Sequence, residues 1–90
     1  MPTVKHIPGP YRFFFYSFDC NEPEHVHVQR EDRVCKYWLA PLALSRNDGF
    51  SARELNQIRA EVVRNVDSIL EAWYEHCGER WGPDSEGFSL

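Results

Sequence analysis

The sequence predicts an α+β fold: a small antiparallel sheet of three to four strands packed on one long C-terminal helix. Three observations support this prediction. The chain up to residue 39 holds short runs rich in aromatic and β-branched residues, and turn-forming residues separate these runs. Residues 51–77 place apolar side chains every three or four positions, as an amphipathic helix does. No apolar run approaches the roughly 20 residues that span a bilayer, so we expect no membrane partner.

The first two strands are expected at residues 3–7 and 11–18, on either side of a Pro-Gly-Pro turn. The second run, YRFFFYSF, is apolar on both faces except at Arg12 and Ser17. Aromatic residues are favoured in strands, and apolar side chains on both faces indicate a central position in the sheet. Residues 19–24 are polar and rich in turn formers, so we expect a loop there.

Residues 25–30 and 33–39 predict a β-hairpin, because two alternating runs flank a gap of two acidic residues. We expect Arg30 to pair with Arg33, and side chains then alternate between the two faces of the sheet. The face expected to pack on the helix carries Val26, Val28, Cys35, Tyr37 and Leu39. The opposite face, which we call the open face, is polar and carries His25, His27, Gln29, Val34, Lys36 and Trp38. A function is expected on the open face.

One long helix is expected at residues 51–77, and residues 42–50 are expected to connect it to the last strand. Ser51 is a suitable N-cap residue, and Glu54 three positions later completes the pattern of a capping box. Gly78 is a typical residue just after a helix end. The apolar stripe expected to meet the sheet consists of Leu55, Ile58, Val62, Val66, Ile69, Trp73 and Cys77.

The chain is expected to form one α+β domain over residues 1–78, followed by a mobile tail over residues 79–90. The tail mixes Gly, Pro, Ser and acidic residues without periodicity. The first residues lack the apolar stretch and cleavage site of a signal peptide, which favours a cytoplasmic location. In that compartment we expect the three scattered cysteines, Cys20, Cys35 and Cys77, to stay reduced.

The open face gathers the candidate functional residues of the chain. In one register of the aromatic strand, a cluster suited to an anionic ligand consists of Arg12, Tyr16, His25, His27 and Lys36. Trp38 lies beside this cluster and is available for stacking. A slip of the hairpin by one residue would instead bury both histidines.

The motifs MPTV, YRFFFYS, NEPEHVHV, KYWLAP and GFSAREL occur in this order along the chain. Their combination resembles the bacterial family called domain of unknown function 4160. The resemblance covers roughly residues 1–77, and Glu24 stands where the family pattern usually has a second proline. No catalytic residue is established in the family, so the resemblance implies none for this chain.

The resemblance implies a short cytoplasmic bacterial protein. Many members are encoded next to another small domain of unknown function, numbered 2442, which implies a toxin–antitoxin-like two-gene pair. We therefore expect action by protein–protein interaction with a small protein encoded nearby, without a cofactor. A homo-oligomer stays open as a further assembly. The expected binding residues are Tyr16, Glu22, His25, His27 and Trp38.

The alternative is an enzyme, a metal-independent endoribonuclease toxin that cleaves RNA. Two histidines with pKa values near neutrality can share the proton transfers of this reaction. The expected catalytic residues are then His25 and His27, with Arg12 and Lys36 to hold the phosphate. A net charge of −4 opposes binding of a polyanion, which favours the interaction protein over the enzyme.

Two further interpretations of the histidine pair stay open. A metal-binding protein is the second alternative, because His25 and His27 can chelate together and Cys20 or Glu22 can add a ligand. The other interpretation is structural: the ring nitrogens would then tie down the loop at residues 21–24 by hydrogen bonds.

Overall fold

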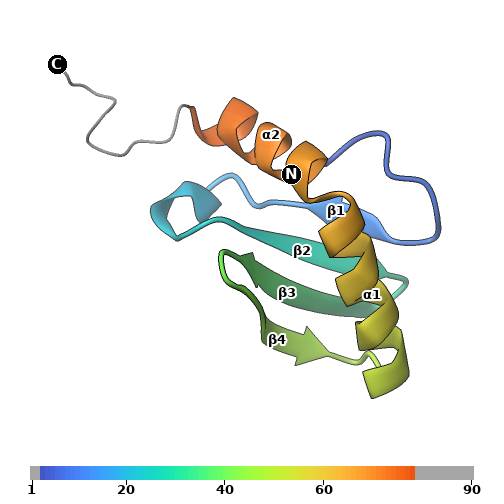
Figure 1. The fold of residues 1–90 in the computed structure, drawn as a ribbon. Coiled ribbons are helices and arrows are strands. Elements are labelled where there is room, and N and C mark those ends of the chain that lie inside the picture. Colours follow the sequence, from blue (N-terminus) through green and yellow to red (C-terminus); the bar gives the residue numbers. More distant parts are fainter. Residues whose placement is uncertain (1–2, 79–90) are drawn as a thin grey trace, which may run out of the picture.

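The computed structural model describes residues 3–78 and confirms the α+β fold (Figure 1). Its elements are β1 (Arg12–Phe14), the 3-10 helix η1 (Asp19–Asn21), β2 (His25–Arg30), β3 (Arg33–Leu39), β4 (Leu42–Asp48), α1 (Ala52–Arg64) and α2 (Val66–Cys77). The four strands form one antiparallel sheet in the order β1-β2-β3-β4. The two helices follow the sheet in the chain.

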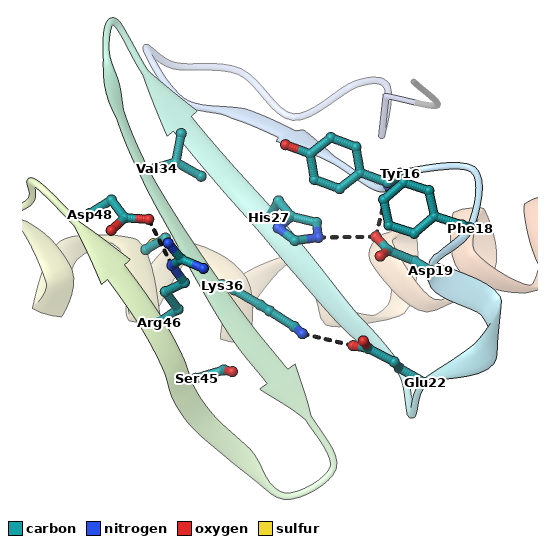
Figure 2. Close-up of a pocket in the computed structure, with 11 residues that line it drawn as sticks. Tyr16, Phe18, Asp19, Glu22, His27, Val34, Lys36, Ser45, Arg46 and Asp48 are labelled. Carbon is teal, nitrogen blue, oxygen red and sulfur yellow. Dashed lines mark hydrogen bonds and ion pairs between the residues drawn. The ribbon is translucent and has the colours of Figure 1, made fainter.

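The predicted hairpin of β2 and β3 is confirmed in its register, with Arg30 opposite Arg33 and His25 opposite Trp38. The inner face of the sheet and one side of both helices meet in a single hydrophobic core. The buried side chains that the two faces share are Val26, Val28, Cys35 and Tyr37 from the sheet and Ile58, Val62, Ile69 and Trp73 from the helices. Figure 2 looks onto the open face, with the helices behind the sheet.

Two predictions for the first strands are wrong. Residues 3–7 do not form a strand; Thr3 makes an isolated bridge to Phe14, and the N–H of Val4 donates to the carbonyl of Phe13. The aromatic run forms only the three-residue strand β1, at an edge of the sheet and not at its centre. Phe13 and Phe15 enter the core, while Phe14 lies under His27, so the run is apolar on both faces without being central.

The prediction that residues 42–50 form a connection is also wrong, because Leu42–Asp48 is the edge strand β4. Leu42 pairs with Leu39 across a two-residue turn. The remaining residues of β4 are all exposed, so the strand has no alternation of apolar and polar side chains by which its sequence could be recognised. The pairing shifts by one residue between Lys36 and Tyr37, which leaves Ser45 without a partner on β3.

The predicted long helix consists of two helices that meet at Asn65. The side-chain amide of Asn65 donates to the carbonyl of Glu61 at 2.8 Å, a local bond that competes with regular helix geometry. The N–H of Ile69 still donates to the Asn65 carbonyl, so the apolar stripe continues across the junction. Ser51 is the N-cap of α1 as predicted, and its Oγ accepts from the N–H of Glu54 at 3.1 Å.

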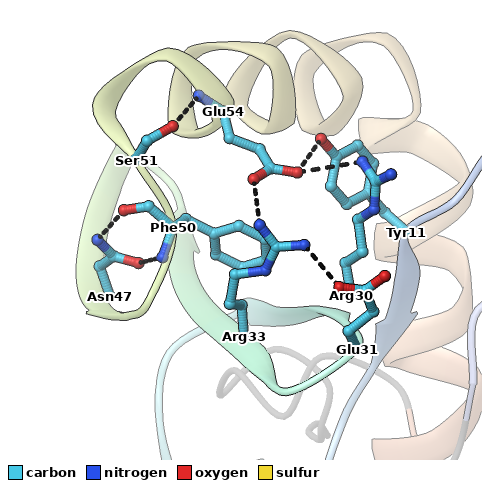
Figure 3. A network of polar contacts seen from close by, with 8 residues as sticks. All are labelled: Tyr11, Arg30, Glu31, Arg33, Asn47, Phe50, Ser51 and Glu54. Atoms are coloured by element: carbon cyan, nitrogen blue, oxygen red, sulfur yellow. Dashed lines mark hydrogen bonds and ion pairs between the residues drawn. The ribbon is translucent and has the colours of Figure 1, made fainter.

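The side chain of Glu54 fastens the start of α1 to the sheet (Figure 3). Its carboxylate accepts hydrogen bonds from the Tyr11 hydroxyl at 3.0 Å, from Arg30 at 3.2 Å and from Arg33 at 3.1 Å. The predicted capping box is therefore only half formed. The backbone N–H of Glu54 donates to Ser51, but the Glu54 side chain binds Arg33 instead of reaching back to the N-cap backbone.

The prediction of three reduced cysteines is wrong for two of them. Cys20 and Cys77 form a disulfide, which joins η1 to the last residue of α2 across a sequence separation of 57. The fold brings these distant residues together, and their spacing in the sequence gave no sign of it. Cys35 is free and buried, as expected, and burial raises the pKa of its thiol to about 12.

The tail predicted at residues 79–90 lies outside the described residues. Among the helices that the structure describes, none is both long enough and apolar enough to cross a membrane.

Candidate functional site

The two histidines of β2 lie on the open face, as predicted, but they are less exposed than a polar surface patch would be. The chain between β1 and β2 folds over this face and carries η1. The side chain of His25 has no exposed surface, and that of His27 is 12% exposed. The predicted accessibility of His25 is therefore wrong, because the covering segment and Trp73 of α2 enclose its ring.

Asp19, on η1, is the centre of the site. Its Oδ2 accepts a hydrogen bond from the N–H of Tyr16 at 2.8 Å and another from Nε2 of His27 at 3.0 Å. The same oxygen lies 3.1 Å from Nε2 of His25. Burial acts to raise the pKa of Asp19, but the hydrogen bond from the Tyr16 N–H and the favourable interactions with His25 and His27 outweigh it and lower that pKa. Asp19 is therefore an ionised carboxylate held between two imidazoles.

His25 is anchored to the loop before β2. Its Nδ1 lies 2.8 Å from the carbonyl oxygen of Pro23, and because a carbonyl only accepts, Nδ1 carries a proton. This contact confirms the predicted bond between a histidine ring and the loop. The ring also packs edge-on against Trp38 and Trp73, with centroids 5.4 and 5.0 Å away.

His27 lies in an aromatic pocket that opens toward solvent. Its ring stacks on Phe14 with centroids 5.3 Å apart and meets the edge of Tyr16 at 4.8 Å. The aromatic strand therefore has the register that places Phe14 and Tyr16 on the open face. Burial lowers the pKa of His27 and outweighs the opposing attraction of Asp19. The imidazole is accordingly neutral near pH 7.

Lys36 and Glu22 form an ion pair across the open face, with Nζ and Oε1 2.7 Å apart (Figure 2). This hydrogen bond is the main reason that the pKa of Glu22 is lowered. Lys36 also lies 4.3 Å above the ring of Trp38, so Trp38 lies below a cation and does not line the groove described below. Oε1 of Glu22 also lies 3.8 Å from Nδ1 of His25.

The predicted cluster is therefore assembled only in part. Tyr16, His27 and Lys36 line one surface. Arg12 lies on the same face of the sheet, opposite Gln29, but outside that surface: it donates to Gln29 at 2.9 Å and covers the ring of Phe14. Asp19 was not among the predicted site residues. The signal for it was its position, three residues after Tyr16 in a turn-forming segment, where an aspartate accepts a backbone N–H.

A groove of about 650 Å³ lies on the open face between η1 and β4 (Figure 2). Asp19 and His27 form part of its floor, and Lys36 and Glu22 cross it. Phe18, which is 70% exposed, stacks on Tyr16 and gives one wall an aromatic surface. Ser45, Arg46 and Asp48 of β4 form the other wall. The charges are paired within the groove, since Arg46 also binds Asp48 at 2.9 Å.

A family model described as Domain of unknown function (DUF4160) matches residues 11–74, which include every residue of the groove. No curated protein and no solved structure matches the chain.

Proposed function

The chain belongs to the domain of unknown function 4160 family, and from this premise we propose that it is a small cytoplasmic bacterial protein that acts by binding another protein. Its partner is a small protein encoded nearby, the second member of a toxin–antitoxin-like two-gene pair. The partner contributes an extended segment that pairs with β4 and places side chains in the groove.

The observation that carries this proposal is the free edge of β4. All residues after Leu42 in this strand are exposed, and within residues 3–78 no strand pairs with its outer side. The opposite edge of the sheet is different, because β1 has three residues and Thr3 and Val4 already bond to it. An unpaired edge offers a row of N–H and C=O groups to another chain.

The side chains around this edge indicate the chemistry of the partner. Leu44 of β4 is 43% exposed and lies opposite Tyr37, on the side of the strand that faces the helices, and Phe18 offers an aromatic surface on the far side of the groove. Lys36 and Arg46 are each paired with a carboxylate. An extended segment with apolar or aromatic side chains suits these surfaces better than a polyanion does.

The endoribonuclease alternative is less well supported by this geometry. General acid–base catalysis needs both groups within reach of the substrate, and His25 has no exposed surface. The expected phosphate ligands are also engaged, Arg12 with Gln29 and Lys36 with Glu22. Expression of the chain alone, with scoring of growth, separates the two functions. An RNase toxin would inhibit growth and lose this effect in His27→Ala.

Co-purification of the chain with the product of the neighbouring gene tests the binding proposal. Leu44→Asp places a charge on the β4 edge, and we expect it to weaken the partner's affinity by about tenfold or more. Val63→Asp is the matched control, because Val63 is 51% exposed on α1, away from the groove. This control is expected to retain full affinity.

Equal affinity of the Leu44→Asp variant and the wild type would overturn the proposal. A concentration-dependent dimer of the chain alone, lost in Leu44→Asp, would assign β4 to a second copy of this chain and would likewise contradict it. Analytical ultracentrifugation of the chain without its partner detects that outcome.

A further inference from the structure

We propose that Asp19, His25 and His27 bind one divalent transition-metal ion, of the class of Zn²⁺ or Fe²⁺, at the floor of the groove. This site is independent of the β4 edge and of the protein partner. It uses an aspartate that the sequence did not single out, together with the two histidines.

The spacing of the three side chains fits a shared ion. Oδ2 of Asp19 lies 3.0 Å from Nε2 of His27 and 3.1 Å from Nε2 of His25, and the potential ligand atoms of the trio lie within 4.8 Å of one another. Bonds of roughly 2.0–2.1 Å to one ion place neighbouring ligand atoms about 2.9–3.4 Å apart. Small shifts of the side chains therefore suffice to admit the ion.

His25 has the arrangement of a metal-ligating histidine. Its Nδ1 donates to the Pro23 carbonyl, which fixes the ring so that Nε2, the atom that carries a lone pair in the neutral imidazole, faces Asp19. This Nε2 is fully buried and makes no hydrogen bond within the described residues. A lone pair directed at a carboxylate is unfavourable, and a cation between the two atoms would turn the contact into two attractive ones.

The other two ligands are held in place in a similar way. The Tyr16 N–H donates to Asp19, so the carboxylate keeps its orientation without the ion. The ring of His27 is held between Phe14 and Tyr16. When Nε2 of neutral His27 binds the ion, the proton of this nitrogen moves to Nδ1. The ion then has two imidazoles and one carboxylate as ligands.

The ligand set indicates the class of metal. Two imidazoles and one carboxylate suit Zn²⁺ and Fe²⁺, whereas Ca²⁺ and Mg²⁺ prefer oxygen ligands alone. Three protein ligands leave at least one coordination position, and because Asp19 and His27 line the groove, that position opens toward it. A water molecule or a side chain of the partner can occupy it.

Titration of the full chain, freed of metal with EDTA, tests the proposal. Calorimetry with Zn²⁺ and the visible absorption of Co²⁺ are expected to show one ion per chain. Asp19→Asn and His27→Gln are expected to weaken binding at least about tenfold. Asp19→Asn keeps an oxygen for the Tyr16 N–H, so it decides the question if His27→Gln does not fold, as judged by circular dichroism.

The matched control is His76→Ala, which alters the other group of potential ligands, Cys20, His76 and Cys77. Its two cysteines are bonded to each other, so the control is expected to bind the ion like the wild type. The proposal is overturned if the wild type shows no saturable binding of either ion, if Asp19→Asn binds as well as the wild type, or if His76→Ala alone loses binding.

Discussion

Asp19 lies between two histidines in a site that three neighbouring groups hold together. It receives the N–H of Tyr16 and the Nε2–H of His27, and the loop carbonyl of Pro23 fixes the ring of His25 beside it. A buried carboxylate is stable only when its charge is compensated, and these contacts supply the compensation. Protonation of this group should therefore affect the stability of the whole fold.

The stability of the fold should depend on pH. The folded-state pKa values of His27 and Asp19 are lowered from their ordinary values of 6.5 and 3.8, so the unfolded chain binds more protons as the pH falls. Stability should be fully present above about pH 6.5 and should decline below it, first through His27 and then, below about pH 4, through Asp19. Urea unfolding between pH 8 and pH 3 measures this decline.

Two substitutions assign the pH effect to its residues. His27→Gln should flatten the decline that starts near pH 6.5, whereas His6→Gln, which removes an exposed histidine, is the matched control. Asp19→Asn should reduce the decline in acid without abolishing it, because the pKa of Glu22 is lowered as well. A decline below pH 6.5 that is unchanged in His27→Gln would contradict the assignment.

Among the contacts between elements, the disulfide fastens η1 to the end of α2. Cys20 directly follows Asp19, and Cys77 ends α2, so the bond attaches the segment that carries the carboxylate to the helix layer. We expect Cys77→Ser to lower the free energy of unfolding by about 2–4 kcal/mol. Chemical denaturation under oxidising conditions measures this loss, and Cys35→Ser, which alters the free cysteine, shows the effect of removing a thiol without a cross-link.

Reduction of the wild type gives an independent check of the same prediction. Treatment with dithiothreitol should lower its stability to that of Cys77→Ser and should leave Cys77→Ser itself unchanged. Equal stabilities of the oxidised and reduced wild type would show that the cross-link does not hold η1.

The elements that the sequence predicts correctly are those with a strong local pattern. The hairpin register followed from strict alternation at residues 25–30, and the start of α1 followed from the Ser51 cap and the apolar stripe. The division of the helix at Asn65 was missed because the stripe continues through it. β4 was missed because its pairing with β3 is tertiary and its exposed residues show no alternation.

The sequence predicts where in the whole molecule the site lies, but not which residues form it. The alternation of β2 puts His25 and His27 on the same side of the strand, opposite to Val26 and Val28, as the sequence predicts, although the ring of His25 also contacts Trp73 of α2. The depth of His25 and the role of Asp19 depend on how the segment before β2 folds back, and no local pattern encodes that path. Arg12 lies on the predicted face but outside the groove, because it binds Gln29, directly opposite on β2.

Among the described residues, β4 and the groove form a continuous exposed surface on the open face. The helices cover one face, and the segment from β1 to β2 covers part of the other. The strip from Phe18 across Lys36 to β4 combines an exposed aromatic side chain with a strand edge that is unpaired within residues 3–78. The proposed function requires that a partner chain pairs with this edge.

Hydrogen exchange of the backbone amides, with and without the product of the neighbouring gene, tests for this pairing. Pairing with a partner strand should slow the exchange of amides in residues 42–48, because N–H groups on the outer side of β4 gain acceptors. The amides of α1, at residues 52–64, serve as the internal reference and should exchange at an unchanged rate. Slowed exchange confined to β4 and the groove is the predicted result. Protection confined to the helices, with β4 unaffected, would contradict the pairing of a partner strand with β4.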